Sequence, residues 1–151
     1  MPMRLKSPLP SLEGITEWIN GEPDLEALSS KPLLIYFWAS SCHICHDNMP
    51  VLKTWREKYI PQGLQIIAIH CPRMKSDTDI EMVKSSIEEC GIIEPCGIDN
   101  LHKAKKAFDN ELWPAYFVFD ADHTLVRRAA GKAGLAMLEP ILDKMFEKSA
   151  V

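Results

Sequence analysis

The 151-residue sequence predicts one α/β domain, a sandwich of helices packed on a mixed sheet. Three observations lead to this fold class. Apolar segments of strand length alternate with amphipathic helical segments along most of the chain. Two of the apolar segments, 31–39 and 63–71, are joined through a helical segment, which predicts parallel strands with a right-handed crossover. Near the end, two strands joined by a short turn predict a hairpin, and a final helix follows it.

The first half of the chain contains the two most apolar strands. KPLLIYFWA (31–39) is apolar without alternation, as expected of a strand buried on both faces. Ser40 and Ser41 follow it as predicted helix caps, and Pro50 predicts a kink in the helix. The elements expected here are, in order, a short edge strand in ITEWIN (15–20), a helical turn in DLEAL (24–28), a strand over 31–39, a helix over 42–59 and a strand in GLQIIAIHC (63–71).

The second half predicts two more helices before the hairpin and the closing helix. Ser76 or Asp77 is expected near the start of the first helix, and Gly91 just past its end. The closing helix is amphipathic. The elements expected here are a helix over 76–91, a short strand in IEPCGID (93–99), a helix in LHKAKKAFD (101–109), strands in PAYFVFD (114–120) and HTLVRRAA (123–130), and a helix over 135–149.

Composition excludes several classes of partner. Apolar residues make up 46% and charged residues 25%, the net charge is −4, and there is no long basic run. Nucleic acid and anionic membranes are therefore not expected as partners. The N-terminus has no continuous apolar core of a signal peptide, and no segment reaches the ~18 apolar residues of a membrane span. We expect a cytoplasmic protein, and a monomer.

The segment SSCHICHD (40–47) is compatible with three chemistries. Cys42, Cys45 and His46 form the C-x-x-C-H signature that attaches a c-type haem. Two Cys and two His within five residues could also bind a metal. A C-x-x-C pair beside an apolar strand is typical of a redox dithiol. With five cysteines in a reducing compartment, a close pair is more often catalytic or metal-binding than structural.

The position of Cys42 favours the redox interpretation. It lies where a buried strand ends and a helix begins, so backbone N–H groups and the helix dipole should stabilise a thiolate and lower its pKa below about 8.5. Cys45 lies one helical turn further on. We predict that the more exposed Cys42 attacks a substrate disulfide and that Cys45 then releases the product from the mixed disulfide. This chemistry needs no cofactor.

Two questions stay open at this level. His43 either lowers the pKa of Cys42 further as an imidazolium or is only a solvated residue at the helix start. A metal or haem module using Cys42, Cys45 and His46 is the alternative function. It is disfavoured because no export signal, no haem-pocket helix and no second ligand pair at zinc spacing are present.

FWASSCHICHDNMP (37–50) resembles the active-site strand, turn and helix of thioredoxin-like proteins, and LWPAYFVFD (112–120) resembles their cis-proline segment. The order of elements matches this family from about residue 30 to 148. LPSLEGITEWINGE (9–22) is similar to the N-terminal extension of the redoxin branch, the ResA/TlpA-like proteins, and in particular of the cytosolic YkuV-like thiol–disulfide oxidoreductases.

The resemblance implies a three-layer α/β/α thioredoxin-like fold over 1–151, with 1–30 as a redoxin-type extension. It implies that Cys42 and Cys45 form a redox-active disulfide, that Pro114 is cis, and that the backbone beside it pairs with an extended substrate. Trp113 is then a substrate-binding candidate. The expected partners are disulfide-containing proteins or small thiols and an upstream thiol reductant, with no bound metal or cofactor.

The sequence departs from the family at three positions near the cysteines. Tyr36 stands where thioredoxins have a buried Asp, Asn48 where the ResA branch has a Glu, and Ser41 where thioredoxin has a Trp. The usual proton acceptor for Cys45 is therefore missing, and Asp47, His46 or water are the candidates. A peroxidase is not expected, because Ile35 and Ala39 replace the Pro and Thr of the peroxiredoxin pattern.

The remaining cysteines, Cys71, Cys90 and Cys96, are predicted to lie in or beside the core as small apolar residues. Cys71 ends a strand near the expected active-site edge, so it is the candidate for a secondary redox role.

Overall fold

The computed structural model describes residues 3–147 and contains one six-stranded mixed sheet, in the order β1-β4-β3-β2-β5-β6. β2, β3 and β4 are parallel, whereas β1, β5 and β6 run antiparallel to their neighbours. The parallel β2–β3 pair, the hairpin β5–β6 and the edge position of β1 confirm the predictions. The strands are β1 Glu17–Ile19, β2 Leu33–Trp38, β3 Gln65–His70, β4 Cys96–Ile98, β5 Ala115–Phe119 and β6 Leu125–Ala130.

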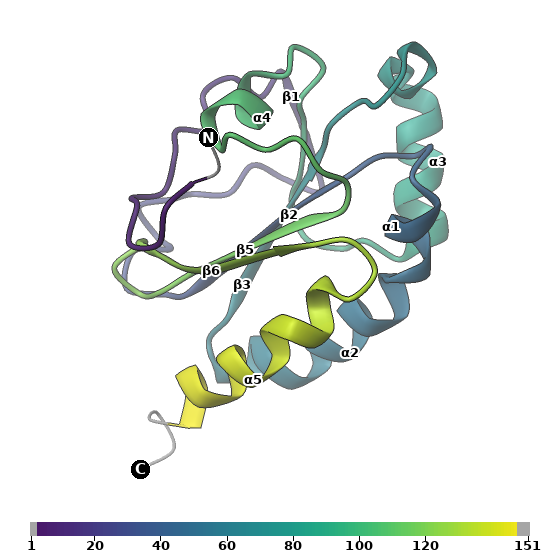
Figure 1. Cartoon of the computed structure of the whole chain (residues 1–151). Coiled ribbons are helices and arrows are strands. Elements are labelled where there is room, and N and C mark those ends of the chain that lie inside the picture. The colour runs from purple at the N-terminus through teal and green to yellow at the C-terminus, as the bar shows by residue number, and fades with distance from the viewer. Residues whose placement is uncertain (1–2, 148–151) are drawn as a thin grey trace.

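Helices cover both faces of the sheet and make the predicted three-layer sandwich (Figure 1). α1, α2, α3 and α5 pack on one face, and α4 with the N-terminal segment covers the other. The helices are α1 His43–Asp47, α2 Met49–Tyr59, α3 Ile80–Cys90, α4 Lys103–Ala107 and α5 Gly134–Glu147, with 3-10 turns η1 Ile60–Gln62 and η2 Lys75–Thr78. The last two residues of the predicted final helix, 148 and 149, lie outside the described residues.

Strand β2 divides the core into two parts. All six of its residues are buried, as its apolar sequence predicted. Successive side chains of a strand point to opposite faces, so Leu34, Tyr36 and Trp38 pack under the active-site helices. Leu33, Ile35 and Phe37 pack against α4 and the N-terminal extension. The carboxyl ends of β2 and β3 therefore lie side by side, and both lead directly into the segments that form the site.

Several predicted helix boundaries were wrong. The helix expected over 42–59 is two helices that meet at Asn48, two residues before Pro50, because proline lacks the N–H that would continue the ladder. The helix expected over 76–91 begins at Ile80, and its cap is Asp79, whose carboxylate accepts from the N–H of Glu81. DLEAL, by contrast, makes the single turn predicted for it, in which the N–H of Leu28 donates to the carbonyl oxygen of Asp24. Within residues 3–147, the model contains no helix that is long and apolar enough to cross a membrane.

Candidate active site

Cys42 and Cys45 form a disulfide at the start of α1. Cys42 is itself the N-cap of this helix, and its Sγ accepts a hydrogen bond from the N–H of Cys45 at 3.1 Å. The predicted capping by Ser40 and Ser41 was therefore wrong. A sulfur in a cap position receives backbone N–H donors directly, which is the arrangement that stabilises a thiolate once the disulfide is reduced.

Both cysteines are buried in this oxidised state, with Cys42 2% exposed and Cys45 1% exposed. The expectation of a clearly exposed Cys42 does not hold for this state. The disulfide explains the burial of Cys42, because it holds the two sulfurs together. Both residues belong to the core cluster. The side chain of His43, by contrast, is 89% exposed.

Ser40 is held from both sides by histidines. His70, at the end of β3, accepts at Nε2 from the N–H of Ser40 (3.0 Å). His46, on α1, donates from Nε2 to the carbonyl oxygen of Ser40 (2.9 Å). The two imidazoles therefore use the same ring atom in opposite roles, and both pack edge to face against Trp38. Trp38 is fully buried and packs against both imidazoles.

Ser41 is bound to a buried carboxylate. Asp77 has no exposed surface, and it accepts from the N–H of Ser41 (3.1 Å) and from its hydroxyl (2.7 Å). The same carboxylate accepts from the N–H groups of Arg73 and Met74, and Arg73 donates from Nη1 to the carbonyl oxygen of Ser41. Asp77 thus joins the segment after β3 to the residue that precedes Cys42. The sequence pattern predicts Asp77 only as a residue near the start of a helix.

Burial acts differently on the two polar groups that hold the turn. Burial lowers the pKa of His70 to about 4, against the opposing charge of Asp77, so the imidazole is neutral at physiological pH and can accept at Nε2. For Asp77, burial disfavours the charge, but hydrogen bonds from Ser41, Arg73 and Met74 outweigh it and lower the pKa. The anion at Asp77 and the neutral ring at His70 thus both persist around neutral pH.

Trp113 and Pro114 lie beside this turn, at the start of β5. The Trp113–Pro114 peptide bond is cis. The indole of Trp113 donates from Nε1 to the carbonyl oxygen of Cys71 (2.8 Å) and packs against the core clusters on both sides of the sheet. Within the described residues, the backbone N–H and carbonyl of Trp113 form no hydrogen bond. They are therefore available to an extended partner.

A buried acid does lie beneath the site, but it comes from another part of the chain than the family pattern suggests. The hydroxyl of Tyr36, at the position of the usual Asp, donates to Glu94 (2.8 Å). Arg56 donates to both oxygens of the Glu94 carboxylate, at 2.7 and 2.9 Å. No local sequence pattern indicates this triad, because its members come from β2, α2 and the segment before β4.

The other candidate proton acceptors for Cys45 are engaged elsewhere. The carboxylate of Asp47 lies on the surface, 3.4 Å from the imidazole of His43. His46 is bound to Ser40, and its Nδ1 lies 3.4 Å from the sulfur of Cys90. Asn48 is buried and donates to the hydroxyl of Tyr116 (2.8 Å). In the oxidised state, none of these three side chains forms a hydrogen bond with Cys45.

The alternative metal or haem module finds no ligand set. Within residues 3–147, no three His, Cys, Asp or Glu side chains are grouped to hold a metal ion. Cys42 and Cys45 are bonded to each other, and Nε2 of His46 is used by Ser40. Of the other cysteines, Cys71 and Cys96 are buried and Cys90 is half-buried, as predicted. Burial raises the pKa of the Cys71 thiol, so this thiol keeps its proton at neutral pH.

The comparison with known proteins agrees with this geometry. The model of the AhpC/TSA family matches residues 7–128. The chain belongs to this family. It is 39% identical over 148 residues to the thiol–disulfide oxidoreductase YkuV of Bacillus subtilis (strain 168), covering 97% of this chain and 99% of the relative. It is 28% identical over 131 residues to the thiol–disulfide oxidoreductase ResA of Bacillus thuringiensis (strain Al Hakam), covering 87% of this chain and 73% of the relative.

A solved structure described as a thioredoxin-like protein in the oxidised form superimposes with a TM-score of 0.87 at 39% identity, over 97% of this chain and 99% of that chain. The fold is therefore thioredoxin-like, as predicted. Together with the Cys42–Cys45 disulfide, these relatives identify the chain as a thiol–disulfide oxidoreductase. They imply disulfide-containing substrates as a class.

Proposed function

We propose that this chain is a disulfide reductase in which Cys42 is the nucleophile and Cys45 the resolving thiol. The main observation in support is the position of Cys42, which caps α1 and whose sulfur accepts a hydrogen bond from the N–H of Cys45. In the reduced protein, the Cys42 thiolate attacks one sulfur of a substrate disulfide and expels the other as a thiolate. Cys45 then attacks Cys42 in the mixed disulfide, releases the reduced substrate and leaves the Cys42–Cys45 disulfide.

We propose that the substrate binds as an extended segment beside Trp113 and Pro114. The unpaired N–H and carbonyl of Trp113 support this, because a peptide strand can pair with both groups. The indole is anchored by Cys71, so it offers a rigid apolar surface next to these groups. Leu112, the residue before Trp113, is more than half exposed and adds apolar area.

The setting proposed for this reaction is the cytoplasm, with the chain acting as a monomer. An upstream thiol reductant of the cell would return the disulfide to the dithiol after each turnover. The net charge of −4 supports a partner other than nucleic acid or an anionic membrane. His43 is proposed to favour the thiolate of Cys42 in this cycle, and its exposed position makes that contribution small.

Two measurements test the proposal. In the Cys45→Ser variant, a disulfide-bonded peptide should accumulate as a stable adduct on Cys42, whereas Cys42→Ser should trap nothing. Equilibration of the wild-type pair with a glutathione series gives the potential. A value near or below about −270 mV supports a reductant, and one near about −180 mV or above assigns an oxidant or isomerase role instead. An adduct on Cys45 in Cys42→Ser at the rate seen for Cys42 would overturn the assignment of nucleophile.

A further inference from the structure

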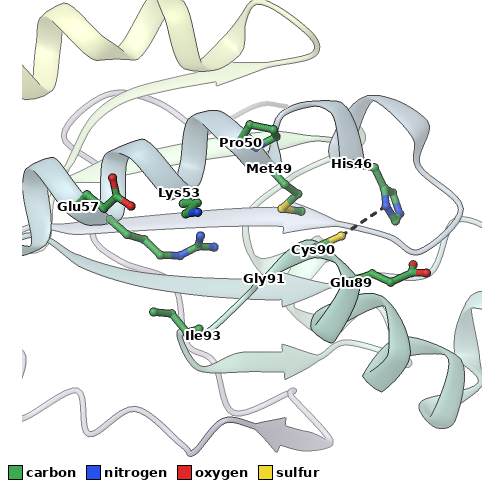
Figure 2. Close-up of a pocket in the computed structure, with 10 residues that line it drawn as sticks. His46, Met49, Pro50, Lys53, Glu57, Glu89, Cys90, Gly91 and Ile93 are labelled. Atoms are coloured by element: carbon green, nitrogen blue, oxygen red, sulfur yellow. Dashed lines mark hydrogen bonds between the residues drawn. The ribbon is translucent and has the colours of Figure 1, made fainter.

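A cavity whose lining includes neither Trp113 nor Pro114 lies between α2 and α3. Its volume is about 720 Å³, within the range of about 300–1,000 Å³ typical of small-molecule sites. Figure 2 shows its lining side chains, which come from α1, α2, the end of α3 and the segment after it. They include the cation Lys53 and two anions, Glu57 and Glu89, whereas the Arg56 guanidinium in the same wall is already paired with Glu94. A lining of both signs suits a ligand that itself carries amino and carboxylate groups.

The cavity contains a thiol beside an imidazole. Cys90, the last residue of α3, is half-buried, and its sulfur lies 3.4 Å from Nδ1 of His46 (Figure 2). Because Nε2 of His46 donates to the carbonyl of Ser40, that nitrogen carries the proton in the neutral ring. Nδ1 is therefore the acceptor and faces the thiol. This is the orientation in which an imidazole serves as base to a cysteine.

Cys90 differs in this respect from the other two free cysteines. Cys71 and Cys96 are fully buried, and neither lines this cavity. Burial and the neighbouring charge of Glu89 raise the pKa of Cys90, partly offset by Arg56, so at neutral pH the thiol keeps its proton until a base removes it. A thiol of this kind depends on His46 for any reaction that requires the thiolate.

We propose that Cys90 is a second redox-modified thiol of this protein, one that forms a mixed disulfide with a low-molecular-weight thiol of the glutathione class bound in the cavity between α2 and α3. This site is distinct from the Cys42–Cys45 pair and does not depend on it. His46 acts as a positioning base through its Nδ1.

The reaction is a thiol–disulfide exchange with an oxidised small-thiol disulfide. Nδ1 of His46 takes the proton of Cys90, and the thiolate attacks one sulfur of the small disulfide. The bond from Cys90 to that sulfur forms as the original S–S bond breaks. The departing thiolate takes the proton back from the imidazolium, so one protein thiol and one disulfide give one mixed disulfide and one small thiol.

The test uses the full chain with its Cys42–Cys45 disulfide intact, so that only Cys71, Cys90 and Cys96 are free. Oxidised glutathione is added, and the adduct is located by fragmentation mass spectrometry. We expect one glutathionyl group, on Cys90. Cys96 is the internal control, since no Lys or Arg lies between it and Cys90 and trypsin leaves both in one peptide. Cys90→Ser should remove the adduct.

His46→Gln tests the base. Glutamine keeps an N–H donor for the Ser40 carbonyl but cannot accept the proton of Cys90. The rate of adduct formation should fall by about tenfold or more, because a positioned base typically contributes about 10²–10⁴-fold. The assignment of this site would be overturned if Cys96 or Cys71 were glutathionylated at the rate seen for Cys90. It would also be overturned if no adduct formed at all. An unchanged rate in His46→Gln would overturn the role of the imidazole.

Discussion

Two buried carboxylates of this protein, Asp77 and Glu94, are stabilised in different ways. Asp77, with no exposed surface, accepts hydrogen bonds only from uncharged donors, the N–H and hydroxyl of Ser41 and the N–H groups of Arg73 and Met74. Glu94, 6% exposed, faces a full positive charge, since the Arg56 guanidinium binds both of its oxygens. The first arrangement joins two loops, and the second joins a helix to the segment before a strand.

This difference indicates which part of the molecule each carboxylate stabilises. A carboxylate satisfied by backbone donors fixes the conformation of those donors, so Asp77 orders the segment that borders Cys42. A buried ion pair contributes little net stability, but it makes each partner dependent on the other. Glu94 therefore matters for the fold, and Asp77 for the shape of the site. The predictions below separate these two roles.

The largest effect is expected for Glu94→Gln. This change leaves the charge of Arg56 buried, at 8% exposure, without its partner. Loss of one member of a buried pair costs about 3–5 kcal/mol, and urea unfolding should show this as a lower midpoint. Arg56→Met combined with Glu94→Gln should recover a large part of the loss, because no charge then remains unpaired. A loss under about 1 kcal/mol for the single change would mean that water reaches the pair in solution.

The next effect is a dependence of stability on pH that originates at His70. Its pKa is lowered by burial from 6.5 to about 4 in the folded protein. Between these two values the unfolded chain binds a proton that the folded protein does not, so stability falls as the pH falls from about 6.5 to 4. A shift of this size corresponds to about 3 kcal/mol.

Unfolding free energies of the wild type and of His70→Gln, measured from pH 7 to pH 4, isolate this contribution. The difference between the two proteins should change across that window, because glutamine accepts from the N–H of Ser40 without titrating. Parallel profiles would show that His70 titrates normally in the folded state. The other four histidines are present in both proteins and cancel in the difference.

Asp77→Asn should have a smaller and more local effect. The amide can accept from Ser41, but its NH₂ group would face the N–H groups of Arg73 and Met74, which then lose their acceptor. Hydrogen bonds to a charged group contribute about 1.5–3 kcal/mol each at most, so a global loss of about 2 kcal/mol is expected. Amide hydrogen exchange should accelerate at residues 73 and 74 and at Ser41.

Glu94→Gln is the matched control for this experiment, because it should accelerate exchange across the core without a preference for these three amides. Unchanged protection of Arg73 and Met74 in Asp77→Asn would show that the segment is ordered by other contacts. The exchange pattern thus distinguishes the acid that shapes the site from the acid that maintains the fold.

The features that sequence predicted correctly depend on local rules. Continuous apolarity identified β2, Pro50 marked the interruption of the helix, and the spacing of Cys42 and Cys45 predicted the redox pair. The features it missed depend on contacts across the chain. Ser40 meets a residue 30 positions away, Ser41 one 36 away and Tyr36 one 58 away. Nothing in the local sequence around these residues indicates which polar partner the fold will bring to them.

Histidines show the same limit. His43, between the two cysteines, was the one selected from sequence, yet its side chain lies in solvent. From the sequence, His46 is expected only as a metal or haem ligand or a proton acceptor and His70 has no expected role, yet both imidazoles bind Ser40. A histidine next to Cys42 in the sequence therefore does not have to place its imidazole against the turn that carries Cys42.

His43→Ala is expected to have the smallest effect of the four changes. An imidazolium at this position should favour the Cys42 thiolate, so its removal should raise the pH at which the reduced Cys42 is half-maximally alkylated. At 89% exposure, and with the Asp47 carboxylate 3.4 Å away, solvent and the opposite charge screen the interaction. The increase should be no more than about half a pH unit. Asp47→Asn is the paired control and should move the midpoint the other way, since it removes the screening anion. Identical midpoints in all three proteins would assign His43 to the solvated helix surface alone and leave the N–H of Cys45 as the donor that stabilises the thiolate.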